Sequence, residues 1–152
     1  MSLDAATVLG FDFGLKRIGI AVGQTLTAAA RPLVTVKTLD DQPDWNAIDR
    51  VIENWRPTRL IVGLPTQLDD SEHPLAAEVR QFAAELQQRY ALPVELVDER
   101  LSSHEAAQIA VTAGRRRVVP HQRAAKETLD RIAAQVILET WLIEQSHDRR
   151  PS

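Results

Sequence analysis

The sequence predicts an α/β protein in which a mixed β-sheet carries helices on both faces. Two observations support this fold class. Residues 7–39 contain short runs with the two-residue alternation of strands, and the turns between them are short enough for antiparallel pairing. From residue 44 onward, stretches with the helical spacing of apolar residues alternate with short apolar runs, which is typical of parallel strands joined by helices.

Three strands are expected first, at residues 7–13, 17–23 and 33–39. The first two are close enough to form a hairpin, and the third extends an antiparallel start to the sheet. Glycines inside a strand weaken it unless they serve a purpose, so Gly19 and Gly23 indicate a bulge or the close approach of another backbone segment.

Helices and strands then alternate. The expected order is a helix capped by Asp44 and ended by Pro57, a strand at residues 60–63, a helix over 75–90, a strand at 94–97, a helix from Ser102 to near Gly114, and a last helix from Leu129. The polar tail from Ser146 is expected to fray. No internal repeat or linker is visible, so we expect one domain over residues 1–152 with an ordered core of about 7–144.

Composition narrows the functional classes. The chain has 152 residues and no cysteine, which excludes disulfides, zinc–thiolate sites and cysteine nucleophiles. No apolar run approaches the ~20 residues of a membrane span, and the first residues lack the basic start of a secretory signal. We therefore expect a cytoplasmic protein with no membrane contact.

The net charge of -3 is not that of a strongly basic nucleic-acid binder, but the basic residues are unevenly distributed. One short stretch before Glu127 gathers Arg115, Arg116, Arg117, His121, Arg123 and Lys126. Two interpretations remain open for this stretch. It is either a solvated, mobile loop or an arm that grips the phosphates of a nucleic acid.

Asp12 is the strongest single signal for chemistry. It interrupts an otherwise apolar strand between Phe11 and Phe13, where a charge is costly unless it is paired or coordinated. The structural alternative is a turn aspartate that caps the following loop. Lys16 and Arg17 come soon after it, and they can either neutralise Asp12 or bind a substrate phosphate.

Two further acids stand at the ends of predicted elements. Asp98 and Glu99 follow the strand at 94–97, and because strand side chains alternate, one of them is the better ligand and the other a structural partner. Asp130 stands at the start of the last predicted helix, beside its apolar stripe. The structural alternative for Asp130 is an ion pair with Lys126, one helical turn away.

If Asp12, Glu99 and Asp130 converge, they form a site for a hard divalent cation, because Mg²⁺ and Mn²⁺ prefer carboxylate oxygens. Asp98 is an alternative ligand. A pair of such ions can hold both the attacking and the leaving oxygen of a phosphodiester. The residues therefore predict a metal-dependent nuclease, with Asp12, Glu99 and Asp130 as its catalytic acids.

Four motifs resemble those of one known family. They are Gly10-Phe11-Asp12-Phe13-Gly14-Leu15-Lys16-Arg17-Ile18-Gly19, Val62-Gly63-Leu64-Pro65, Asp98-Glu99-Arg100-Leu101-Ser102 and Leu129-Asp130-Arg131-Ile132-Ala133-Ala134. In order and spacing the chain resembles the YqgF family, the RuvX-like pre-16S rRNA nucleases, also described as Holliday junction resolvases. One departure falls in residues 68–73, where the family carries an Asp-Gly pair and a further glycine.

The resemblance implies a ribonuclease H-like fold with a five-stranded mixed sheet of order 3-2-1-4-5. It also implies a bacterial, cytoplasmic protein of ribosome biogenesis whose active-site acids correspond to Asp12, Glu99 and Asp130. The expected cofactor is Mg²⁺ or Mn²⁺. Phosphate contacts are expected from Lys16, Arg17, Arg115, Arg116, Arg117, Arg123 and Lys126.

Several functions stay open at this point. The nuclease would act on precursor 16S rRNA or, alternatively, on branched DNA as a junction resolvase. The stretch from Asp12 to Lys16 also resembles the phosphate loop of actin-like and sugar-kinase folds, so an ATP-binding module is a further alternative, as is a non-catalytic nucleic-acid adaptor. The apolar residues are mostly accounted for by the predicted core, so we expect a monomer or a weak homodimer.

Overall fold

The computed structural model describes residues 6–40, 42–65, 75–98 and 122–148, with side chains described over 128–145 of the last range. The elements are β1 (Thr7–Phe13), β2 (Arg17–Gln24), β3 (Ala29–Leu39), β4 (Gln42–Pro43), α1 (Trp45–Trp55), β5 (Arg59–Leu64), α2 (Ala76–Tyr90), β6 (Val94–Asp98) and α4 (Gln122–Asp148). The helix expected from Ser102 and the unusual segment 68–73 lie outside the described residues.

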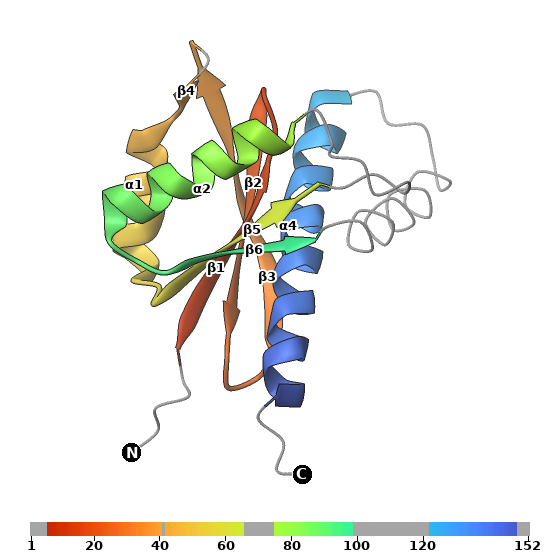
Figure 1. Cartoon of the computed structure of the whole chain (residues 1–152). Coiled ribbons are helices and arrows are strands. Elements are labelled where there is room, and N and C mark those ends of the chain that lie inside the picture. Colours follow the sequence, from red (N-terminus) through yellow and green to blue (C-terminus); the bar gives the residue numbers. More distant parts are fainter. Residues whose placement is uncertain (1–5, 41, 66–74, 99–121, 149–152) are drawn as a thin grey trace.

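The strands form one mixed sheet with the order β4-β3-β2-β1-β5-β6 (Figure 1). β1, β2 and β3 pair antiparallel, whereas β5 lies parallel to β1 and β6 parallel to β5. The expected order 3-2-1-4-5 is confirmed for the five main strands. The sixth strand, β4, was not predicted, because its two residues are too few to show an alternating pattern.

Each face of the sheet has its own apolar core. Leu9 and Phe11 of β1 belong to the core under α1 and α2, and Val8 belongs to the core under α4. The alternation expected for β1 is therefore confirmed. It places Asp12, which has the same parity as Val8, on the α4 side of the sheet.

The first helix begins and ends where the sequence predicts. The Asp44 carboxylate accepts a hydrogen bond from the backbone N–H of Ala47 at 3.3 Å, which satisfies one of the free donors of the first turn. At the other end Arg56 adopts a left-handed conformation with φ of 45°, and Pro57 follows it. Proline cannot continue a helix because it lacks the N–H, so α1 stops here.

Helix α2 is fixed to its surroundings by aromatic and polar contacts. The ring of Phe82 stacks on Trp45 with centroids 5.7 Å apart, and the Tyr90 hydroxyl donates a hydrogen bond to Asp49 of α1. Burial, together with this hydrogen bond, raises the pKa of Tyr90 well above its ordinary value, so the phenol remains protonated and keeps donating at all physiological pH values.

Helix α4 differs from the sequence-based expectation at its start. It begins at Gln122, about two turns before Asp130, and not next to Asp130. The residues between Arg123 and Thr128 are good helix formers without proline or glycine, so nothing ends the helix on that side. At the other end the helix continues to Asp148, past the Ser146 at which fraying was expected. Among the described helices, none is long and apolar enough to cross a membrane.

The backbone of α4 comes into close contact with the sheet at Gly19 of β2. A Cβ atom added at Gly19 would overlap the backbone carbonyl oxygen of Asp130, and one at Gly23 would lie 2.8 Å from Cδ1 of Leu142. Gly19 thus marks the close approach of another backbone segment, as expected, whereas at Gly23 the atoms of α4 that come close are side-chain atoms. A bulge does occur in β2, but it lies between Ile20 and Ala21.

We predict that Gly19→Ala destabilises the fold by at least about 2 kcal/mol, because the methyl group meets helix backbone that cannot move aside alone. Gly23→Ala should cost less, since the atom nearest to its methyl group is the tip of the flexible Leu142 side chain. Chemical unfolding of both variants checks this. Equal stability of Gly19→Ala and the natural protein would show that α4 is not held against β2 in this way.

Candidate active site

Asp12 lies near the carboxyl end of β1 on the face covered by α4, and its side chain is half-buried. Its cross-strand partner in β2 is Gly19. Directly paired residues of neighbouring strands share a face and lie about 5 Å apart. The absence of a side chain at Gly19 therefore leaves space beside the Asp12 carboxylate.

The backbone of Asp130 in α4 packs against Gly19 at this point. The Asp130 carbonyl lies directly over Gly19, so α4 brings Asp130 to the immediate neighbourhood of Asp12. A single contact between helix and strand thus places the backbone of Asp130 over the residue that pairs with Asp12, although the two acids are distant in the sequence. This arrangement supports the convergence that the sequence suggested.

Arg17, the first residue of β2, is the partner of Asp130 in the structure. Its Nε donates to Oδ2 of Asp130 at 2.8 Å, and the two side chains are 25% and 22% exposed. The sequence offered Lys126 as the partner of Asp130, but the side chain of Lys126 is outside the described part. Arg17 was expected near Asp12 or a phosphate, and it connects β2 to α4 beside Asp12.

The acidic pair after β6 is placed only in part. Glu95 and Val97 face α4, because Glu95 accepts a hydrogen bond from Trp141 Nε1 at 3.2 Å and Val97 packs with the α4 core. Asp98 has the opposite parity in this strand and is exposed. Glu99 falls outside the described residues, so its predicted role as a ligand is not tested.

Oxygen donors at this position fit a hard divalent cation. Asp12 and Asp130 supply carboxylates, and β1, β5 and β6 end at the same edge of the sheet because they are parallel. Within the described ranges, no three acidic or histidine side chains are grouped closely enough to hold a metal ion. The expected third ligand, Glu99, lies outside the described residues.

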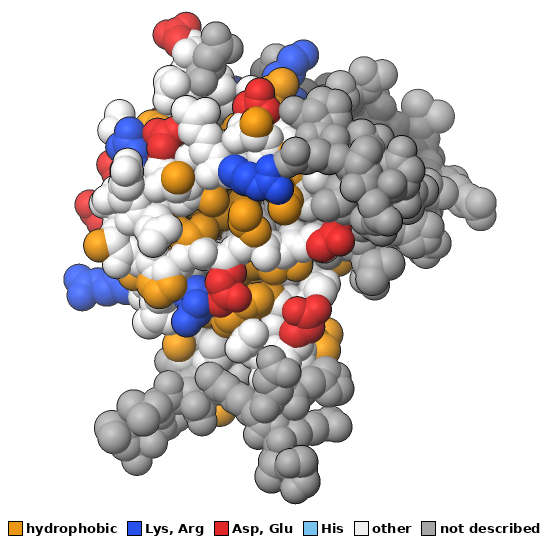
Figure 2. All heavy atoms as spheres, in the orientation of Figure 1, with side chains coloured by type: hydrophobic (Ala, Val, Ile, Leu, Met, Phe, Trp, Pro, Cys, Tyr) orange, Lys and Arg blue, Asp and Glu red, His pale blue; other side chains and the backbone are white. Residues whose placement is uncertain are grey.

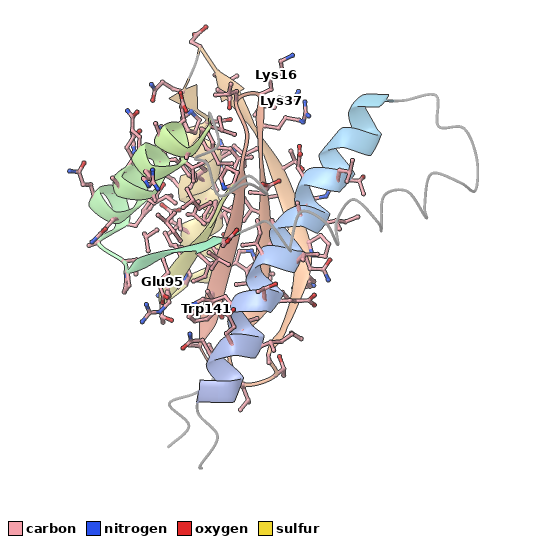
Figure 3. All side chains as sticks on the ribbon, turned by 45° about the vertical axis from the view of Figure 1, so that its right-hand side comes forward. Lys16, Lys37, Glu95 and Trp141 are labelled. Atoms are coloured by element: carbon pink, nitrogen blue, oxygen red, sulfur yellow. The ribbon has the colours of Figure 1, made fainter. Side chains whose placement is uncertain are left out.

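Two lysines stand beside the acids. Lys37 of β3 is the cross-strand partner of Arg17, and Lys16 precedes Arg17 in the turn after β1. Both are exposed, and Figure 3 shows them near each other at the end of the sheet next to the first half of α4. Lys37 was missed in the sequence, because only the register of β2 against β3 brings it to Arg17.

The other predicted phosphate contacts cannot be placed. Arg115, Arg116 and Arg117 lie outside the described residues, and Arg123 and Lys126 belong to the first turns of α4 without described side chains. On the face shown in Figure 2, acidic and basic side chains are interspersed among exposed hydrophobic ones. The described part of that face has no continuous basic surface.

The order of the sheet, with an acid near the end of β1 and another on the helix that crosses β2, defines a ribonuclease H-like protein. Solved structures show the same fold. RuvC of T. thermophilus in complex with a Holliday junction substrate has a TM-score of 0.54 and 17% identity, covering 97% of this chain and 99% of that chain. The Fowlpox virus resolvase, solved with substrate Holliday junction DNA, has a TM-score of 0.52 and 13% identity, covering 91% and 98%.

The chain belongs to the RuvX family, described as Holliday junction resolvase, whose sequence model matches residues 6–144. A relative from Legionella pneumophila (strain Philadelphia 1) is 52% identical over 134 residues, covering 88% of this chain and 93% of the relative. One from Nitrosococcus oceani is 48% identical over 138 residues, covering 91% and 87%. Both carry the name "Putative pre-16S rRNA nuclease". The family resemblance seen in the four motifs is confirmed.

We predict that Arg17 and Asp130 stabilise each other by about 1 kcal/mol, the upper end for a partly exposed pair, because both groups are partly shielded from water. A double-mutant cycle with Arg17→Gln and Asp130→Asn measures this coupling by chemical unfolding. The matched control is the Arg59–Glu95 pair, which is more exposed at 38% and 41% and should couple more weakly. Zero coupling between Arg17 and Asp130 would contradict the pairing.

Proposed function

We propose that this protein is a nuclease that depends on Mg²⁺ or Mn²⁺ and cleaves precursor 16S rRNA. The single observation that carries the proposal is that the Asp130 backbone carbonyl lies over Gly19, the strand partner of Asp12. The fold, the family and the names of the relatives support the same reading.

Asp12, Asp130 and Glu99 are the proposed ligands and catalytic acids. Glu95 and Val97 face α4, whereas Asp98 has the opposite parity in β6, which disfavours Asp98 as the third ligand. When bound, the ion would polarise the phosphodiester and activate a water molecule. The three carboxylates would hold the ion.

Arg17 has two proposed roles at this site. Without a divalent ion, its guanidinium offsets the charge of Asp130 next to a second carboxylate, which otherwise repels it. With substrate present, the same guanidinium is well placed to donate hydrogen bonds to a phosphate, for which arginine geometry is suited. Lys16 and Lys37 flank it and would bind neighbouring phosphates. Arg115, Arg116, Arg117, Arg123 and Lys126 are proposed as further phosphate contacts.

A junction resolvase is the second candidate, favoured by the family description and by the fold of the junction-bound structures. Resolution of a four-way junction requires two paired incisions, and therefore two active sites in a symmetric dimer. The exposed large hydrophobic side chains of the described ranges are spread over both ends of the sheet and the outer strand, not gathered in one interface. This distribution favours the rRNA substrate and a monomer or weak dimer.

We predict that Asp12→Asn abolishes metal-dependent cleavage. The cleavage rate should fall by at least roughly 100-fold, because the loss of a residue that only supports a metal ligand can already cost that much activity. The fold should remain intact and the metal-free protein should be no less stable, because one of two neighbouring like charges is removed. Thermal unfolding and RNA cleavage with Mg²⁺ and Mn²⁺ measure both effects.

Glu144→Gln is the matched control for this variant, since Glu144 is an exposed acid of α4 far along the helix from Asp130, and it should cleave normally. Full activity of Asp12→Asn would remove Asp12 from the site. Phosphate release from ATP that is lost in Asp12→Asn would instead favour the ATP-binding alternative, and binding of RNA without any cleavage would favour the non-catalytic adaptor.

We predict that depletion of the protein in its native cell makes a 16S precursor with an unprocessed 5′ end accumulate. RNA blotting or primer extension across the 5′ end measures this precursor. Restoring the natural gene, but not the Asp12→Asn variant, should remove it. Normal processing in depleted cells, combined with symmetric nicking of synthetic four-way junctions by a stable dimer, would replace the rRNA substrate with the junction.

A further inference from the structure

A cleft of 310 Å³ opens on the face of the sheet opposite to α4. Its walls come from three places: Phe13 and Leu15 at the end of β1, Thr38 with β4 at the end of β3, and the exposed side of α2. This volume is within the range of small-molecule sites, roughly 300–1,000 Å³. None of the roles proposed above uses this cleft.

The cleft lies at the same end of the sheet as the acids. Phe13, in its wall, directly follows Asp12, and strand alternation sends the two side chains to opposite faces. The backbone N–H of Thr38 donates to the carbonyl of Lys16 at 3.1 Å. The wall of the cleft is therefore tied by one hydrogen bond to the turn that carries Lys16 and leads into Arg17.

The lining combines aromatic rings with hydrogen-bond acceptors. The half-buried ring of Phe13 lines the cleft, and the ring of Phe82, with its centroid 5.0 Å away, is only 2% exposed and supports Phe13 from the core. Glu78 and Glu85 of α2 add carboxylates at the rim, and side-chain amides come from Gln42 and Gln81. This combination suits the flat face and the amino edge of a nucleobase, since aromatic rings stack with bases and carboxylates accept from the amino group of cytosine.

The charges around the cleft favour different positions for the base and the phosphate of a nucleotide. Glu78 and Glu85 repel phosphate, whereas Lys16 and Lys37 attract it from outside the cleft. A nucleotide at this end of the sheet is thus oriented with its base toward α2 and its phosphate toward the lysines and the acids of the active site.

Leu15 marks the mouth of the cleft. It is 64% exposed, although it lies in the short turn between Asp12 and Arg17. Of the exposed large hydrophobic side chains in the described ranges, Leu15 is the one that lines this cleft. Exposed apolar side chains beside a nucleic-acid site are suited to contact bases that have left the stack.

We propose that this cleft binds one unpaired nucleobase of the substrate strand, held by Leu15 and the ring of Phe13 while Lys16 and Lys37 hold the adjoining backbone. The inference rests on the proposed nuclease function and specifies its substrate as a strand with an unpaired nucleotide beside the cleavage position. A base with an exocyclic amino group is preferred over uracil. A fully paired duplex cannot place a base in the cleft.

The first test compares Leu15→Ala with Leu26→Ala. Leu26 is 63% exposed and lies in the β2–β3 turn, at the opposite end of the hairpin, so it is a matched control. Binding of single-stranded ten-nucleotide RNA and of its duplex is measured by fluorescence anisotropy with Mg²⁺ and Mn²⁺ removed by EDTA. Leu15→Ala should weaken binding of the single strand by about fivefold or more and leave duplex binding unchanged, and Leu26→Ala should change neither.

The second test addresses the acidic rim. The natural protein should bind oligocytidine more tightly than oligouridine, and Glu78→Ala combined with Glu85→Ala should remove this preference. The readout is the ratio of the two affinities, because removal of two negative charges raises the affinity for every nucleic acid. Glu53→Ala, at an exposed position of α1, is the control and should keep the ratio.

The outcomes separate this inference from the proposed function. Unchanged single-strand affinity in Leu15→Ala, or an unchanged ratio in the acidic-rim variant, would overturn the base-binding cleft even if RNA is still bound and cleaved with metal. Failure of the natural protein to bind any RNA or DNA would overturn both the cleft and the nuclease. If Leu15→Ala lowers the thermal midpoint of unfolding, its affinities are not interpreted. The ratio of oligocytidine to oligouridine affinity in the acidic-rim variant then decides whether the cleft binds a base.

Discussion

The contact between Gly19 of β2 and the backbone of α4 is the constraint on which the rest of the site depends. The missing side chain at Gly19 lets the backbone carbonyl of Asp130 rest directly on the strand. Because Gly19 pairs with Asp12, the same contact that anchors α4 also brings the second acid to the first.

Carboxylates that share a metal site repel each other when the metal is absent. Arg17 offsets this repulsion through its 2.8 Å bond to Asp130, and its own position is set by the pairing of β2 with β3. Under the proposed mechanism, the guanidinium exchanges its carboxylate partner for a phosphate when a cation and substrate arrive. In these proposals the two faces of the sheet have different roles. The acids on the α4 side bind the metal ion, and the cleft beside α2 binds a base.

The sequence predicted the elements with strong periodicity and the acids that break it. Asp12 stood out because it interrupts an apolar strand, and in the structure the alternation of β1 places it on the same face as Val8. Contacts between distant segments were not predictable in the same way. Lys37 and the Arg17–Asp130 pair depend on strand register and helix placement, and β4 is too short for any pattern. The start of α4 was placed too late because the apolar stripe begins at Leu129, whereas helix-forming residues before it extend the helix to Gln122.

The most direct test of the proposed metal site is diffraction from crystals grown with saturating Mn²⁺, recorded at the manganese absorption edge. We expect an anomalous peak bounded by the carboxylates of Asp12 and Asp130, with the Arg17 guanidinium no longer bonded to Asp130. A manganese ion bound only elsewhere, or no peak at these two acids in saturated crystals, would contradict the claim that the contact at Gly19 builds a metal-dependent active site.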